Sequence, residues 1–182
     1  MANILCILGS PSAPSRTAFM ADYVVEQLGR AGHAVETLVL RDLPAEDLVK
    51  ARMNAPEIAK AIAQVESAQA VIVATPIYKA AYSGLLKTFL DLLPQFGLQD
   101  KAILTLATSG GPAHVMAIDY ALRPVLMSLG AHHVEPSWVI MEQGISKQQD
   151  GKYELTAETR GKLDEMAGRF SGYLKRHAHD HT

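Results

Sequence analysis

The chain has 182 residues, of which 48% are hydrophobic and 20% are charged, and its formal net charge at pH 7 is -2. These values predict one globular domain with a sizeable core, residues 1–175, and exclude the strongly basic surface of a nonspecific nucleic-acid binder. Cys6 is the only cysteine, so no internal disulfide can form, and no apolar stretch approaches the roughly 20 residues that span a bilayer. We therefore expect a cytoplasmic protein with no nucleic-acid or membrane partner.

Short apolar runs alternate with amphipathic segments along the whole chain. The pattern predicts strands at 3–8, 35–40, 70–74, 101–107 and 134–141, and helices at 17–30, 56–67, 84–93, 113–129 and 156–175. Five such alternations favour an α/β fold, a flavodoxin-like five-stranded parallel sheet with helices on both faces. Residues 176–182, RHAHDHT, are expected to be a disordered tail, and we assign no function to its histidines.

The loop after the first predicted strand is rich in hydroxyl groups. Gly9 allows a tight turn, and the next helix begins among polar side chains that include Ser10, Ser15, Arg16 and Thr17. Free amides and the positive end of a helix dipole favour an anion at such a place. The loop has neither recurring glycines nor a following lysine, so a monophosphate fits it better than a dinucleotide or ATP. The alternative is an ordinary helix cap with nothing bound.

The second loop, ATPIYKAAYSGLLK, follows the most strand-like run of the chain. Pro76 lacks an N–H donor and is predicted to end the strand, which would expose main-chain groups of Ile77 and Tyr78, followed by Lys79. Such an edge of amides and carbonyls suits a planar heterocycle. The alternative is a proline at a strand end with tyrosines packed at the surface.

The third loop, TSGGPAH, combines hydroxyl groups with paired glycines. Thr108 and Ser109 come first, and Gly110 and Gly111 would let the backbone approach a flat ligand closely. His114 follows at the start of the next helix. No carboxylate lies near it in the sequence, so a position at the edge of the ligand is favoured over a role as general acid.

A phosphate site and a flat-ring site side by side describe a crevice for flavin mononucleotide, FMN. The motifs GSPSAPSRT, ATPIYKAAYSGLLKTFLDLLP and TSGGPAHVMAIDYALRPVL together resemble the NADPH-dependent FMN reductase family, most closely the reductase component of two-component alkanesulfonate monooxygenases. The similarity covers nearly the whole chain and weakens after Pro136. It implies hydride transfer from NADPH, with NADH left open, to FMN. Reduced FMN would then pass to a partner monooxygenase that liberates sulfite from organosulfonates.

The resemblance also assigns residues by position. It places Ser10, Ser15, Arg16 and Thr17 at the phosphate, residues 76–79 at one edge of the flavin ring, and residues 108–111 at the other. No catalytic residue is assigned, because hydride transfer to a flavin is chemistry of the cofactor. Close relatives carry an arginine where this chain has Ser12. One cation facing the phosphate is therefore expected to be missing, and Arg16 is the candidate to replace it.

The helix predicted at 113–129 contains a residue that does not belong to its apolar stripe. The stripe consists of Val115, Ile118, Leu122, Val125 and Leu129. Tyr120 lies off the stripe, and Pro124 cannot donate to its carbonyl, so the helix must kink, widen into a π-bulge or find another donor. In the resembling reductases a tyrosine here belongs to a π-helix at the subunit interface near the flavin. We therefore expect a homo-oligomer, dimer or tetramer; the alternative is a surface tyrosine on a kinked helix.

Three other functions remain open at the level of the sequence. The first is a reductase of quinones, azo dyes or metal ions that retains its FMN. The second is a flavodoxin-type electron carrier, and the third is a protein that binds a phosphorylated metabolite. Carriers tend to be strongly acidic, whereas this chain is near neutral.

Overall fold

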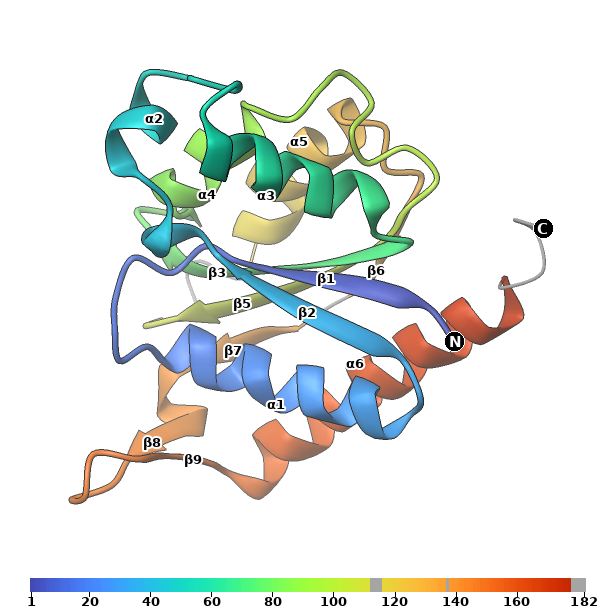
Figure 1. The fold of residues 1–182 in the computed structure, drawn as a ribbon. Coiled ribbons are helices and arrows are strands. Elements are labelled where there is room, and N and C mark those ends of the chain that lie inside the picture. Colours follow the sequence, from blue (N-terminus) through green and yellow to red (C-terminus); the bar gives the residue numbers. More distant parts are fainter. Residues whose placement is uncertain (112–115, 137, 178–182) are drawn as a thin grey trace.

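A parallel sheet forms the centre of the molecule, for which the computed structural model describes residues 1–111, 116–136 and 138–177 (Figure 1). Its strand order is β2-β1-β3-β5-β6. The bounds are β1 Asn3–Leu8, β2 Ala34–Val39, β3 Ala70–Tyr78, β5 Ala102–Ser109 and β6 His133–Glu135. All four neighbouring pairs are parallel. This is the flavodoxin-like order, and it confirms the predicted fold class.

Helices cover both faces of the sheet, as predicted from the alternating pattern (Figure 1). One face carries α1 Arg16–Arg30 and α6 Ala157–Arg176, and the other carries α2 Ala45–Val49, α3 Pro56–Ser67, α4 Gly84–Leu90 and α5 Arg123–Ser128. Each face has its own apolar core cluster, and the strand between them, β3, is buried from Ala70 to Ile77. Burial on both faces explains why the strands have continuous apolar runs. No helix in the described part of the chain is long and apolar enough to cross a membrane.

The prediction that Pro76 ends its strand is wrong. β3 continues to Tyr78, and Pro76 lies opposite Thr108 of β5. The ladder between β1 and β3 ends at Ala74, so β3 has no partner strand on that side at Pro76. A proline is tolerated at such an edge because no donor is needed there. Past the proline, β3 turns back and pairs with the short strand β4, Ala81–Tyr82.

The fifth predicted strand, 134–141, is also wrong as a single element. It is split into β6 and β7, Val139–Met141, which both pair with β5. Pro136 lies between them and has no N–H for the ladder. The hairpin of β8, Ile145–Lys147, and β9, Tyr153–Leu155, has no counterpart in the prediction.

The boundaries of the other elements lie close to those predicted, and the start of the helix predicted at 113–129 lies outside the described residues. Only α4 ends clearly earlier, at Leu90 in place of residue 93. α6 continues to Arg176, and the ring of His177 stacks on Tyr173. The rest of the predicted tail, 178–182, lies outside the described residues.

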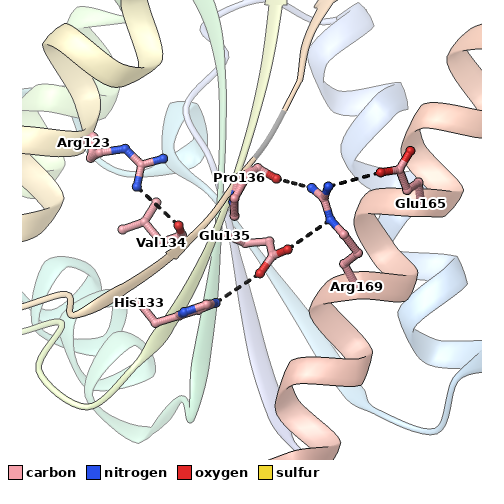
Figure 2. Close-up of polar contacts among 7 residues, drawn as sticks. All are labelled: Arg123, His133, Val134, Glu135, Pro136, Glu165 and Arg169. Atoms are coloured by element: carbon pink, nitrogen blue, oxygen red, sulfur yellow. Dashed lines mark hydrogen bonds and ion pairs between the residues drawn. The ribbon is translucent and has the colours of Figure 1, made fainter.

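A charged cluster joins the edge strand β6 to α6 (Figure 2). Glu135 is buried, with 7% of its surface exposed, and its carboxylate lies 3.1 Å from His133 Nε2 and 3.1 Å from Arg169 Nε. Arg169 also pairs with the exposed Glu165 at 3.1 Å and donates to the carbonyl of Pro136. The cluster therefore holds α6 to the sheet where the edge strand is interrupted.

Candidate functional site

Three loops meet at the carboxyl edge of the sheet, as the sequence predicts. They follow β1, β3 and β5, which are neighbours in the sheet. The hydroxyls of Thr17 and Thr108 are hydrogen-bonded at 2.6 Å and join the first loop region to the third. Ser83 Oγ donates to the carbonyl of Gly9 at 2.5 Å and joins the second to the first. The strand order reverses between β1 and β3, which is where flavodoxin-like sheets bind ligands.

The first loop ends in a helix terminus suited to an anion. Ser15 is the N-cap of α1 and its hydroxyl accepts from the amide of Ala18 at 3.2 Å, while Ser10 Oγ lies 2.7 Å from Ser15 Oγ. The amides of Arg16 and Thr17 have no acceptor among the described residues. Free amides at the positive end of a 15-residue helix fit the phosphate of FMN.

Arg16 is directed away from the centre of this loop. Its Nε donates to the carbonyl of Ile145 at 3.0 Å, and its Nη1 pairs with Glu142 at 3.3 Å. Both partners belong to the segment around β8. The expectation that Arg16 supplies the missing phosphate cation therefore has no support in its contacts.

The second loop contains two consecutive residues with left-handed backbone. Lys79 has φ 48° and Ala80 has φ 63°, and together they form the two-residue turn between β3 and β4. Asn and Gly normally occupy such turns, because a Cβ atom disfavours positive φ. Tyr78 beside the turn is 48% exposed, whereas Ile77 is buried. Strained backbone of this kind concentrates at ligand sites.

We expect Ala80→Gly to raise the free energy of unfolding by about 0.5 kcal/mol. Removing the Cβ relieves about 1–2 kcal/mol of left-handed strain, and the greater freedom of glycine in the unfolded chain offsets part of it. The matched control is Ala81→Gly in β4, where φ is not positive, and here we expect a loss of about 0.5–1 kcal/mol. Urea denaturation measures both, and equal losses in the two variants would contradict the assignment of strain to Ala80.

Sequence reasoning missed Thr75, a buried residue that hydrogen-bonds to both ends of this loop. Thr75 is fully buried, and its hydroxyl accepts from the amide of Ser83 at 3.0 Å and donates to the carbonyl of Pro76 at 3.0 Å. The signal was present in the sequence, because Thr75 is the only hydroxyl residue in the otherwise apolar run AVIVATPI.

The third loop uses its serine to shape its own turn. Ser109 Oγ donates to the carbonyl of Gly111 at 2.9 Å and accepts from its amide at 3.3 Å. Among the described residues, a Cβ atom built on Gly110 or on Gly111 would meet nothing within 4 Å, so this part of the chain leaves both glycines open. That open space suits a ring lying against the backbone. His114 lies outside the described residues.

The helical segment before α5 confirms one of the alternatives predicted from Pro124. Residues Ile118–Leu122 form a π-helix, and Tyr120 is 73% exposed. The described part of the predicted stripe faces the core: Ile118 and Leu122 are buried, and Val125 and Leu129 are partly buried against the same cluster, which also includes Leu126. Val115, the first residue of that predicted stripe, lies outside the described residues.

A cavity of about 290 Å³ lies at the opposite, amino edge of the sheet. Its lining includes Lys101, His133 and Tyr173. Ligands of flavodoxin-like sheets bind beyond the carboxyl ends of the strands, so we do not assign the flavin to this cavity.

Comparison with known proteins identifies the family. Residues 2–145 match the family model described as NADPH-dependent FMN reductase. The chain belongs to this family. It is therefore an oxidoreductase whose cofactors are FMN and NAD(P)H.

Two relatives and one solved structure illustrate the similarity. The FMN reductase (NADPH) of Escherichia coli strain K12 is 45% identical over 132 residues, which are 72% of this chain and 69% of the relative. The NADH-dependent FMN reductase SfnE of Pseudomonas putida is 31% identical over 132 residues, 71% of each chain. The apo form of the NADH:FMN oxidoreductase EMOB superposes with a TM-score of 0.85 at 38% identity, covering 95% of this chain and 90% of that one.

Proposed function

We propose that this FMN reductase treats the flavin as a substrate and releases reduced FMN to a partner monooxygenase of organosulfonate assimilation. The relatives support this proposal because their names give FMN as the molecule that is reduced. The observation that carries it is that the three loops meet where the strand order reverses, between β1 and β3. The free amides of Arg16 and Thr17 lie at one end of this place, and the two glycines of the third loop, Gly110 and Gly111, lie at the other. The choice of monooxygenase rests on the resemblance of the motifs.

Different residues of the crevice bind different parts of FMN. The amides of Arg16 and Thr17, with Ser10 and Ser15 beside them, hold the phosphate. The end of β3 with the first residue of its turn, residues 76–79, and the end of β5 with the two glycines after it, residues 108–111, hold the two edges of the ring. The flavin, when bound, supplies the hydride acceptor, and the protein provides position and an open face for the nicotinamide.

The test is anaerobic oxidation of NADPH with flavin-free protein in catalytic amount and FMN in excess. We expect many equivalents of free reduced FMN per chain. Reduction that stops near one equivalent would show that the flavin is retained, and an FMN-retaining reductase of quinones, azo dyes or metal ions would replace this proposal. Parallel reactions with NADH establish the preference for the nicotinamide.

We also propose that Tyr120 lies at a subunit interface of a homo-oligomer. It is exposed on the π-helix, and two further apolar side chains of the same stretch of chain, Met116 before the π-helix and Met127 on α5, are 56% and 60% exposed. Clustered exposed apolar side chains mark interaction surfaces. The proposal leaves open whether the assembly is a dimer or a tetramer.

We expect Tyr120→Ala to weaken subunit assembly about tenfold or more while the monomer stays folded, because buried aromatic residues dominate interfaces. Sedimentation at several concentrations measures assembly, and circular dichroism checks the fold. The matched control is Val49→Ala, an exposed apolar residue on α2, which should leave assembly unchanged. Unchanged assembly together with unchanged turnover in Tyr120→Ala would contradict the proposal.

A further inference from the structure

The loop between β1 and α1, residues 9–15 (the phosphate loop), contains no arginine. Ser12 occupies the position at which the resembling reductases carry arginine, and its side chain is exposed. Arg16, the nearest cation in the sequence, is held by Ile145 and paired with Glu142 on the side of β8. A cation at the centre of this loop therefore has to come from another part of the chain.

Arg41 is that cation. It belongs to the short 3-10 helix Leu40–Asp42, which directly follows β2. Because β2 pairs in parallel with β1 and Leu8 lies opposite Val39, this helix and the phosphate loop leave the same edge of the sheet side by side. Arg41 Nη1 donates to the carbonyl of Ser12 at 3.1 Å. The guanidinium thus touches the loop at the residue where the arginine is missing.

The surroundings leave the guanidinium able to bind an anion. One of its five N–H groups is used by Ser12, and Nε lies 3.6 Å from Asp42, whose side chain is 69% exposed. The Arg41 side chain is 27% exposed, so it is partly shielded from water. Burial raises the pKa of Asp22 on α1, and the charge of Arg41 partly lowers it again, which places Arg41 near the first turns of that helix.

We propose that Arg41 is the residue that recognises the phosphate of FMN in this protein, in place of the arginine that the loop lacks. Arg41 follows β2 and is 29 residues from Ser12 in the sequence, and it contacts the loop through the carbonyl of Ser12. The inference rests on the proposed function in one respect, that the loop after β1 holds the phosphate of the flavin. The inference goes beyond the proposed function by naming the charged residue that makes the site selective for a phosphorylated flavin.

The experiment compares FMN with riboflavin, which has the same ring and no phosphate. Dissociation constants come from flavin fluorescence in flavin-free protein, without NADPH. In Arg41→Gln we expect FMN to bind about tenfold more weakly, because a charged hydrogen bond to the phosphate is lost, and riboflavin to bind as in the parent protein. The matched control is Arg52→Gln, which removes the same charge from an arginine paired with Glu46 and Asp47 away from the loop. Its ratio of FMN to riboflavin affinity should stay within about twofold of the parent ratio.

Two further measurements separate the charge of Arg41 from a scaffold role of its bond to Ser12. Ser12→Arg in the Arg41→Gln background returns a cation to the loop but not the bond, and we expect it to restore most of the preference for FMN. The preference of the parent protein should also fall as salt rises from about 50 to 500 mM, and that of Arg41→Gln should fall much less, because salt screens an exposed ion pair.

The outcomes distinguish this inference from the proposed function. If Arg41→Gln keeps the parent ratio, or if Arg16→Gln removes the preference and Arg41→Gln does not, the inference is overturned while the flavin site stands. If Ser12→Arg fails to restore binding and salt has no effect, Arg41 only shapes the loop, and the inference is also overturned. If the parent protein binds FMN no better than riboflavin, the assignment of the phosphate to this loop is itself wrong.

Discussion

Replacing Gly9 by alanine is expected to lower the free energy of unfolding by about 2–3 kcal/mol, because the new methyl group overpacks a closed contact. An ideal Cβ atom on Gly9 would lie 2.8 Å from Leu86 Cβ and 3.3 Å from the carbonyl oxygen of Ala74. Leu86 is fully buried in α4, and its Cβ cannot rotate away as a side-chain end could. The backbone of Gly9 is fixed as well, since its amide donates to Ala74 at 2.8 Å and its carbonyl accepts from Ser83 at 2.5 Å.

The matched control for this prediction is Gly84→Ala, at the start of the same helix α4. A Cβ atom at Gly84 would meet nothing within 4 Å, so we expect a change within about 0.5 kcal/mol. Urea denaturation compares the two variants with the parent protein. Equal stability of Gly9→Ala and Gly84→Ala would show that α4 moves aside at no cost, contrary to the close contact between Gly9 and Leu86. Because the phosphate loop begins at Gly9, weaker binding of FMN is expected in the same variant.

Glu135→Gln is expected to cost about 2 kcal/mol of stability. The buried carboxylate faces both His133 and Arg169, and the amide that replaces it leaves the guanidinium of Arg169 without its buried countercharge (Figure 2). The Nε atom of Arg169 is inaccessible to water and has an ion pair but no well-directed hydrogen bond, so it depends on that charge. The expected loss is smaller than that of a fully buried pair because the Arg169 side chain is 38% exposed.

Glu165→Gln provides the comparison, because Glu165 pairs with the same arginine from an exposed position on α6. We expect this variant to lose no more than about 0.5 kcal/mol, the usual contribution of a surface ion pair. Thermal and urea denaturation measure both variants. If Glu165→Gln proved as destabilising as Glu135→Gln, burial would not be the reason for the effect.

Much of the candidate site could be predicted from local sequence. Gly9, Ser15 and Thr17 lie at a strand-to-helix junction, which has a recognisable composition of small and hydroxyl residues. Pro124 predicted a disturbed helix from the missing donor alone, and the π-helix at Ile118–Leu122 is one way in which the chain resolves it. The choice among kink, bulge and new donor depends on packing and was not decided by the pattern.

Other features escaped prediction because proline acts differently at an edge and in the middle of a sheet. Pro76 continues its strand since β1 has already ended on that side, whereas Pro136 interrupts the edge of the sheet and divides one expected strand into two. The neighbours of each proline decide the result, and those neighbours come from distant parts of the chain.

By itself, the sequence determined the layout of the molecule: the alternating strands and helices, the three loops at one edge of the sheet and the hydroxyl-rich helix start. Periodicity and turn composition are local properties, so they can be recognised without knowing the fold. Only the tertiary structure decided which arginine contacts the loop after β1 at Ser12. Arg16 follows Ser15 directly, yet its side chain donates to the carbonyl of Ile145, 129 residues away in the sequence. Arg41 is 29 residues from Ser12 in the sequence, yet its side chain donates to the carbonyl of Ser12. Side-chain direction depends on which elements pack beside the loop, and no local pattern carries that information.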